Sequence, residues 1–207
     1  MRNMKFLELK SQLSKFIIFS LTDIRKIEPG FYRSRLNEWQ NKGYIKKIIK
    51  KNYIFSDQNI DEQTLFFIAN KIYQPSYISL EMVLSYYHLI PESTYGLTSI
   101  TTKKTAIFKT KVGDFSYRSV RPELFFGYSL ADFQGQKIKL AEIEKAILDY
   151  LYLNSHLKTE SDFSELRLNL EELLANWNET KFNQYLTVFT NKRLNARAKK
   201  FINYLKT

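Results

Sequence analysis

The stretch from residue 16 to residue 55 constrains the fold most, because helical and β-rich patterns alternate along it in a fixed order. A short helix is predicted to begin at Ser20, whose hydroxyl can accept a hydrogen bond from a free backbone N–H. Asp23 stands where a capping box usually carries Glu or Gln, and apolar residues recur every three positions through the segment. Pro29-Gly30 then turns the chain and ends this helix.

A second helix is predicted from residue 31 to residue 42, with Gly43 ending it. Tyr32, Leu36 and Trp39 fall on one side of this helix, at spacings of four and three. The opposite side and its flank are rich in Arg, Ser and Asn, which can donate to phosphates and read base edges in the major groove. The candidate DNA-binding residues of this helix are Arg33, Ser34, Arg35, Asn37 and Asn41. The alternative is the solvated face of an ordinary amphipathic helix.

Residues 44–55, YIKKIIKKNYIF, read as two β-rich runs joined by a basic turn. Asn52 is expected to hold the positive φ of this turn, because Asn is one of the few residues other than Gly that tolerate it. One alternative is that the lysines protect an edge strand from aggregation. The order of two helices, a Gly stop and a basic hairpin is nevertheless typical of a winged helix-turn-helix, and it favours binding of double-stranded DNA. The candidate phosphate contacts on or near the hairpin tip are Lys46, Lys47, Lys50 and Lys51.

Two further elements complete this N-terminal unit. The apolar spacing of residues 4–16 predicts a helix that packs on the other two, and FIIF at residues 16–19 predicts a short strand that pairs with the hairpin. The polar run at residues 56–59 is the best domain boundary. The chain is therefore divided into a winged helix-turn-helix domain, residues 1–58, and a C-terminal domain, residues 59–207.

The charge of the chain is distributed unevenly, with a net +11 over 207 residues. Residues 1–56 hold 13 Lys and Arg against 4 Asp and Glu, and residues 57–180 hold 12 against 17. Residues 181–207 hold 7 Lys and Arg and no acidic residue. The basic N-terminal segment agrees with nucleic-acid binding. The basic tail alone is a weaker indication, because solvated lysines are common.

The C-terminal domain is predicted to be an α+β domain with a small antiparallel sheet and several helices. Its first helix is expected over residues 61–73, ended by Pro75, and its second begins with Ser79 as the N-cap. From residue 95 the apolar period changes to two, which predicts strands. These strands lie within residues 95–102, 105–113, 115–122 and 124–133. The later helices are predicted over residues 137–153, 161–175, 178–190 and 192–205.

The composition points away from several kinds of chemistry. The chain has no Cys, only two His on separate segments, and six Gly that form neither a Walker A loop nor a dinucleotide-binding fingerprint. No metal, cofactor or catalytic residue is therefore expected. The N-terminus is too charged for a signal peptide, and no segment has the roughly 20 apolar residues of a membrane span. A cytoplasmic protein without membrane contact is expected.

Two alternatives to DNA binding remain open. Glu142, Glu144 and Asp149 could serve a metal-dependent nuclease, although they point in different directions around one helix. RNA binding would need aromatic side chains stacked on an open sheet face, and burial of those aromatics in the core is the preferred interpretation. The aromatic candidates are Phe115, Tyr117 and Phe125.

Several segments resemble one known family. They are SLTDIRKI from residue 20, YRSRLNEWQNKGYIKKI from residue 32, YISLEMVLSYYHLIPE from residue 77, TSITTKKTAIFKTKVGDFSYRSV from residue 98 and AEIEKAILDYLYL from residue 141. In this order they resemble the AbiEi-like antitoxins of type IV toxin–antitoxin, or abortive infection, systems and the related transcriptional regulators. The most specific part is the helix that carries Ala141, Glu144, Lys145, Ala146 and Asp149. The wing turn departs from the family, because it has Asn52 where Gly is commoner.

The resemblance implies a protein that is not an enzyme. It implies that the winged helix binds operator DNA and represses its own operon, and that the C-terminal domain counters a nucleotidyltransferase toxin. In a type IV system this partnership is functional and need not involve direct contact with the toxin. A solitary regulator without a toxin is the alternative within the same resemblance.

Overall fold

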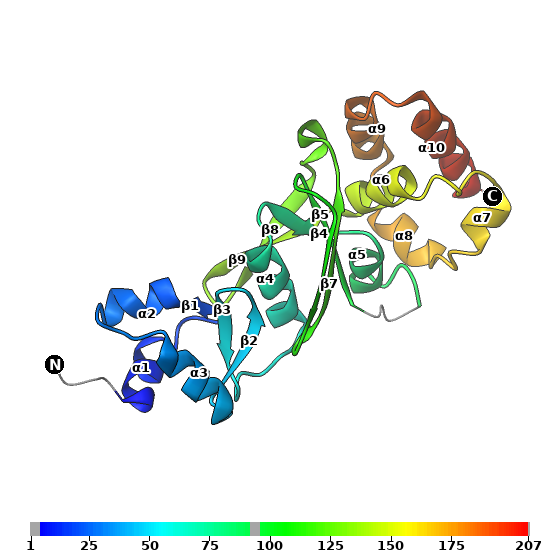
Figure 1. Ribbon diagram of the computed structural model, residues 1–207. Coiled ribbons are helices and arrows are strands. Elements are labelled where there is room, and N and C mark those ends of the chain that lie inside the picture. Colours follow the sequence, from blue (N-terminus) through cyan, green and yellow to red (C-terminus); the bar gives the residue numbers. More distant parts are fainter. Residues whose placement is uncertain (1–4, 92–95, 207) are drawn as a thin grey trace.

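The structure is a computed structural model that describes residues 5–91 and 96–206, and these form an α+β fold. Within them lie ten α-helices, a three-stranded sheet in the order β1-β3-β2 and a six-stranded sheet in the order β6-β7-β5-β4-β9-β8. The three-stranded sheet and the first three helices occupy one end of an elongated molecule, and the last helices occupy the other (Figure 1). The helices are α1 (Phe6–Gln12), α2 (Leu21–Ile27), α3 (Ser34–Asn41), α4 (Glu62–Ile72), α5 (Glu81–Tyr86), α6 (Ile143–Leu153), α7 (Glu160–Ser164), α8 (Leu170–Asn176), α9 (Glu179–Val188) and α10 (Lys192–Tyr204). The strands are β1 (Phe19–Ser20), β2 (Ile45–Ile49), β3 (Asn52–Phe55), β4 (Ser76–Ile78), β5 (Leu97–Thr101), β6 (Ala106–Thr110), β7 (Gly113–Ser119), β8 (Tyr128–Phe133) and β9 (Gln136–Ala141), with a 3-10 turn at Pro122–Leu124.

The N-terminal unit, residues 5–55, begins its second helix at the predicted cap. The Ser20 hydroxyl accepts a hydrogen bond from the Asp23 backbone N–H at 3.3 Å, and the Asp23 carboxylate accepts one from the Ser20 N–H at 2.9 Å. This confirms Ser20 as the N-cap, with Asp standing in for the usual Glu of a capping box. The three helices and the sheet enclose a small core of buried residues: Leu9, Leu13, Phe19, Ile24, Phe31, Leu36, Trp39, Ile45, Tyr53 and Phe55.

Three predictions for this unit need correction. The helix predicted over residues 31–42, α3, begins only at Ser34, so Tyr32 precedes it and is 69% exposed instead of joining the apolar stripe. Lys51, not Asn52, holds the positive φ of the hairpin turn, at +74°, because Asn52 already pairs with Ser20 in β3. The strand predicted at residues 16–19 is reduced to β1, which contains only Phe19 and Ser20.

The prediction of a small antiparallel sheet in the C-terminal domain is wrong, because the sheet has six strands that pair in both parallel and antiparallel directions. β4 runs parallel to β9, and β5 runs parallel to β7, while the remaining pairs are antiparallel. The sequence pattern predicts neither β4, which has only three residues, nor β9, most of which lies within the helix predicted over residues 137–153. Ser79 is not the N-cap of α5, which is Leu80, because the Ser79 hydroxyl donates to Asp149 at 2.9 Å.

The helices at the far end start at side-chain caps of Thr or Asn. Each cap oxygen accepts a backbone N–H three residues further on, which satisfies a donor that the helix leaves free. The single helix predicted over residues 161–175 is instead two short ones, α7 and α8, separated by Arg167 at a φ of +49°. No helix in the described part of the chain has the length and apolar composition needed to cross a bilayer. The caps are Thr159, Asn169, Asn178 and Asn191.

The two parts of the chain meet through apolar contacts. The predicted boundary at residues 56–59 coincides with the segment between β3 and α4. The side chains that face away from the small N-terminal core belong to the main core, together with the residues of α4 and the six-stranded sheet. The N-terminal unit is therefore packed against the C-terminal domain and is not tethered by a free linker. The residues that make this contact from the N-terminal side are Ile17, Ile18, Ile48 and Ile54.

Candidate nucleic-acid interface

The candidate interface begins with the way α3 is held on α2. Arg33 is the backbone N-cap of α3, and the chain before it is anchored by Phe31, whose ring is buried. The Arg35 guanidinium donates to both oxygens of Glu28, at 2.9 and 3.1 Å. It also lies over the rings of Phe31 and Trp39, 4.5 and 5.1 Å from their centroids. Arg35, predicted as a DNA contact, is thus largely engaged in fixing α3 on the rest of the unit.

The solvent face of α3 carries the other four candidates. Arg33, Ser34, Asn37 and Asn41 are all exposed, and the spacing of the last three, i, i+3 and i+7, sets them along one side of the helix. Their amide, hydroxyl and guanidinium groups can all donate hydrogen bonds to a phosphate or a base edge. The predicted polar face therefore exists, without the contribution of Arg35.

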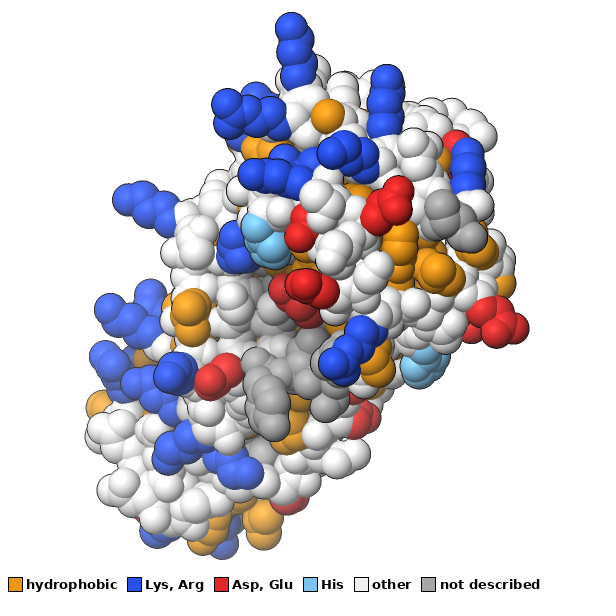
Figure 2. All heavy atoms as spheres, turned by 90° about the vertical axis from the view of Figure 1, so that its right-hand side faces the viewer, with side chains coloured by type: hydrophobic (Ala, Val, Ile, Leu, Met, Phe, Trp, Pro, Cys, Tyr) orange, Lys and Arg blue, Asp and Glu red, His pale blue; other side chains and the backbone are white. Residues whose placement is uncertain are grey.

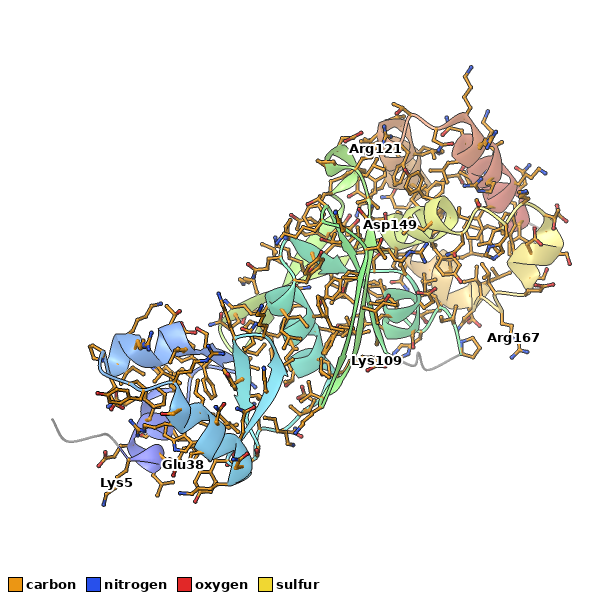
Figure 3. All side chains as sticks on the ribbon, viewed as in Figure 1. Lys5, Glu38, Lys109, Arg121, Asp149 and Arg167 are labelled. Atoms are coloured by element: carbon orange, nitrogen blue, oxygen red, sulfur yellow. The ribbon has the colours of Figure 1, made fainter. Side chains whose placement is uncertain are left out.

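An acidic residue lies beside this face and is paired locally. Glu38 accepts a hydrogen bond from Lys42 at 2.6 Å, one helical turn further along α3. That bond and the charge of Lys42 lower the pKa of the Glu38 carboxyl, and the same contact raises the pKa of Lys42. Figure 3 labels Glu38 at the end of the molecule formed by the N-terminal unit. Lys42 thereby offsets the negative charge that Glu38 would present to DNA.

The hairpin of β2 and β3 carries the four candidate lysines in two groups. Lys50 and Lys51 form the tip and are exposed. Lys46 and Lys47 lie within β2, opposite Ile54 and Tyr53, and only Lys47 is exposed. The register shifts between Lys47 and Ile49, and such a bulge increases the local twist of a hairpin. The tip is therefore the part of the hairpin best suited to meet a phosphate backbone.

A second polar network lies elsewhere and is fully buried. Lys145 and Asp149, one turn apart on α6, form an ion pair with no exposed surface on either side chain. The Tyr77 hydroxyl donates to Asp149 at 2.9 Å and accepts from Lys145 at 2.7 Å. Burial lowers the pKa of Lys145 and raises that of Asp149. Figure 3 shows Asp149 where α6 meets the six-stranded sheet.

This network has the geometry of a structural link, because it joins α6 to β4 and none of its side chains reaches solvent. Gly127, at a φ of +71°, lies so close that an added Cβ would be 2.9 Å from the Lys145 side chain. Sequence reasoning did not predict the network. The available signal was Lys145 and Asp149, which lie four residues apart in a helix rich in apolar residues. Such a pair is rarely buried unless its charges are compensated.

The three carboxylates considered for a nuclease do not come together: Glu142 and Glu144 both lie near the Lys181 amine, at 3.3 and 3.9 Å, whereas Asp149 is held apart in the buried network. Asp149 is held by Lys145, Glu144 accepts the Asn178 backbone N–H at 2.9 Å, and Glu142 accepts the hydroxyl of Tyr185. Within residues 5–91 and 96–206, no three His, Cys, Asp or Glu side chains come together as a metal site would require.

The aromatics considered for RNA stacking are mostly inside the protein. Phe115 and Tyr117 have 1% and 0% of their surface exposed, and Phe125 packs against the main core. The preferred interpretation, burial in the core, is therefore confirmed for Phe115 and Tyr117.

No family model and no curated protein matches this sequence.

Proposed function

We propose that the N-terminal unit is a winged helix-turn-helix that binds double-stranded operator DNA. The observation that carries this proposal is the exposed polar face of α3, followed directly by a hairpin whose tip is Lys50-Lys51. The order of helices and strands in the unit is the order that a winged helix requires. The charge of residues 1–56, 13 basic against 4 acidic residues, supports binding to a polyanion.

The residues take different roles in this proposal. Arg33, Ser34 and Asn37 lie at the start of α3, where recognition helices meet base edges, and Asn41 lies one turn further on. The wing lysines, Lys46, Lys47, Lys50 and Lys51, contact phosphates, with the two at the tip contributing most. Arg35 acts through Glu28, because their ion pair fixes the angle at which α3 leaves the preceding turn.

The wider role of the chain follows from its resemblance to AbiEi-like antitoxins. We infer a cytoplasmic transcriptional regulator that represses its own operon and whose C-terminal domain counters a nucleotidyltransferase toxin. A solitary regulator with the same DNA-binding unit is the alternative. The Ala-x-x-Glu-Lys-Ala-x-x-Asp helix supports the resemblance, and in this structure its Lys145 and Asp149 join α6 to β4.

The direct test is DNA binding by the full chain to the region upstream of its own reading frame. Binding is measured by fluorescence anisotropy against a scrambled duplex of equal length, and the bound bases are mapped by footprinting. A protected site that the scrambled duplex does not compete for supports the proposal. Equal and weak binding to both duplexes counts against an operator-binding function. Co-expression with any nucleotidyltransferase encoded next to it separates the antitoxin from the solitary regulator.

A further inference from the structure

The last helix, α10, has one buried side and one basic side. Its apolar residues are turned into the main core, where Leu194, Ala198 and Phe201 have at most 1% of their surface exposed. At 100° per residue, its six exposed positions fall within an arc of about 120°. Four of these six carry positive charge, and the other two, Ala196 and Asn203, are small or neutral. The exposed positions are Lys192, Arg193, Ala196, Lys199, Lys200 and Asn203.

Among residues 5–91 and 96–206, no acidic side chain balances the positive charge of this side. No Asp or Glu occurs after residue 180, so α10 has no acid of its own. Across the described parts of the chain, Lys192, Arg193 and Lys199 have no acidic partner within ion-pair distance. Lys200 donates to the neutral carbonyl of Lys158 at 3.1 Å. The surface therefore differs from the α3 flank, where Lys42 is paired with Glu38.

A fifth basic residue of α10, Arg197, lies on the buried side of the helix, close to this charge. Arg197 is 8% exposed and donates to the Leu151 carbonyl at 2.9 Å, while its Nε has no hydrogen-bond partner in the structure. Burial, and then the nearby charge of Arg193, lower the pKa of Arg197. Additional negative charge at this surface would relieve the repulsion, so the basic side of α10 is suited to a polyanion.

The spacing along α10 favours a nucleic-acid backbone over an acidic protein. The pair Lys192-Arg193 and the pair Lys199-Lys200 are seven residues apart, which is about 10.5 Å at 1.5 Å per residue. Three steps of about 3.4 Å along a DNA strand cover nearly the same length. The surface between the pairs has no aromatic or large apolar side chain, and such side chains carry most of the energy of protein–protein interfaces.

We propose that the basic side of α10 binds the phosphate backbone of a second nucleic-acid segment, without reading its sequence. α3 and α10 lie at opposite ends of the molecule (Figure 1). Figure 2 looks at the end that contains α10 and shows Lys and Arg side chains gathered at its top. One chain then holds two duplexes, one at each end. That the two segments are bound together rests on the proposed function of α3, whereas phosphate binding by α10 does not.

The test counts duplexes bound per chain. The full-length protein is saturated at low salt with a duplex of about 12 base pairs, about 40 Å long at 3.4 Å per step, and the complex mass is measured by sedimentation. The wild type is expected to bind two duplexes per chain. The variant Lys192→Gln, Arg193→Gln, Lys199→Gln, Lys200→Gln is expected to bind one. A charge-preserving control, Lys192→Arg, Arg193→Lys, Lys199→Arg, Lys200→Arg, should still bind two.

The outcomes separate this inference from the proposed function. If the Gln variant binds as many duplexes as the wild type, the inference is overturned, and attention turns to an acidic protein partner. If the wild type binds one duplex and the Gln variant binds none, α10 binds phosphate and the proposed DNA binding by α3 fails. Loss of one duplex in the Gln variant supports it, provided that the circular dichroism spectrum and melting temperature are unchanged. The variant Lys50→Ala, Lys51→Ala reports on the other end. If it keeps two duplexes while the Gln variant loses one, α10 binds phosphate and the wing assignment fails.

Discussion

The Arg35 guanidinium and the Glu28 carboxylate form a two-bond ion pair, at 2.9 and 3.1 Å, across the turn between α2 and α3. Both side chains are mostly buried, with 16% and 14% of their surface exposed. The pair therefore works as a structural clamp, although the sequence places Arg35 among residues that could face DNA. Arg33, two positions earlier, carries the same charge but is exposed and takes no part in this ion pair.

The first prediction concerns this clamp. Arg35→Ala removes both bonds and the packing on Phe31, and should lower the free energy of unfolding by about 2 kcal/mol, as expected for hydrogen bonds between charged groups. Arg33→Ala, the matched control, should change it by no more than about 0.5 kcal/mol. Urea unfolding followed by circular dichroism measures both. Equal losses in the two variants would show that the ion pair has no special structural role.

The second prediction concerns the hairpin tip. Each phosphate contact contributes about −0.9 to the slope of log K against log salt concentration, so Lys50→Ala, Lys51→Ala should flatten that slope by roughly one to two units. The control removes two exposed lysines from the C-terminal domain, Lys104→Ala and Lys137→Ala, and should leave the slope near the wild-type value. Anisotropy titrations over a range of salt concentrations give the slopes. An unaltered slope in the tip variant rules out the hairpin as a wing.

The third prediction concerns sequence specificity. Asn37 is exposed on α3, and its amide can make two hydrogen bonds to an adenine edge, worth about 1–3 kcal/mol of discrimination. Asn37→Ala should lower the ratio of operator to random-DNA affinity by roughly 5- to 150-fold, at that energy. Asn59→Ala, exposed outside the unit, serves as the control. A loss of the same size on both DNAs would make Asn37 a phosphate contact instead.

The fourth prediction concerns alkaline pH. Burial raises the pKa of Tyr87 to about 12, and it also raises the pKa of Tyr117, whose hydroxyl donates to the Ala69 carbonyl at 2.7 Å. Unfolded tyrosine ionises near pH 10, so below pH 10 both states keep the proton and the stability is fully present. As the pH rises from 10 toward 12, only the unfolded chain loses the proton, and stability falls.

Urea midpoints measured at intervals between about pH 8 and pH 11 should reveal this fall. The variants Tyr87→Phe and Tyr117→Phe are expected to lose less stability over the same interval. Tyr32→Phe, with a ring that is 69% exposed in the parent protein, is the control and should follow the wild type. A wild type with a flat midpoint across the whole interval contradicts the prediction.

Local features of the fold could be predicted from sequence, and long-range ones could not. The cap at Ser20 was predicted, because its side chain bonds a backbone N–H only three residues away. β4 was missed because its three residues are all buried and pair on both sides with strands far along the chain. A strand covered on both faces has no alternating pattern to detect.

The candidate site shows the same difference between local features, which the sequence predicts, and long-range contacts, which it does not. The exposed polar face of α3 follows from helical spacing, whereas the inward turn of Arg35 depends on Glu28 and on ring packing across a turn. The sequence could not distinguish Arg35 from Arg33 for this reason. The excess of Lys and Arg in the last 27 residues is visible in the sequence. That Lys192, Arg193 and Lys199 have no acidic partner in the described part of the chain depends on which elements pack around α10, and the sequence does not show this.

The fifth prediction concerns the contact between the two parts of the chain. Ile54, in β3, has no exposed surface and belongs to the main core of the C-terminal domain. Ile54→Ala should destabilise the full chain by about 2–5 kcal/mol.

Residues 1–58 expressed alone should still bind DNA, more weakly than the full chain, and residues 59–207 should fold alone. Calorimetry of the full chain should give one transition, and two well-separated transitions would contradict the shared core.

The shared core also limits how such a protein can change its target. A DNA-binding domain joined by a flexible linker can be exchanged whole between proteins, but the N-terminal unit that we propose to bind DNA is packed against its neighbour through Ile17, Ile18, Ile48 and Ile54. A grafted domain would have to match that apolar surface as well as the new operator. New binding preferences are therefore more accessible by point substitution on the solvent face of α3 than by recombination. A chimaera that keeps these four isoleucines and replaces only residues 33–41 is the construction most compatible with this architecture.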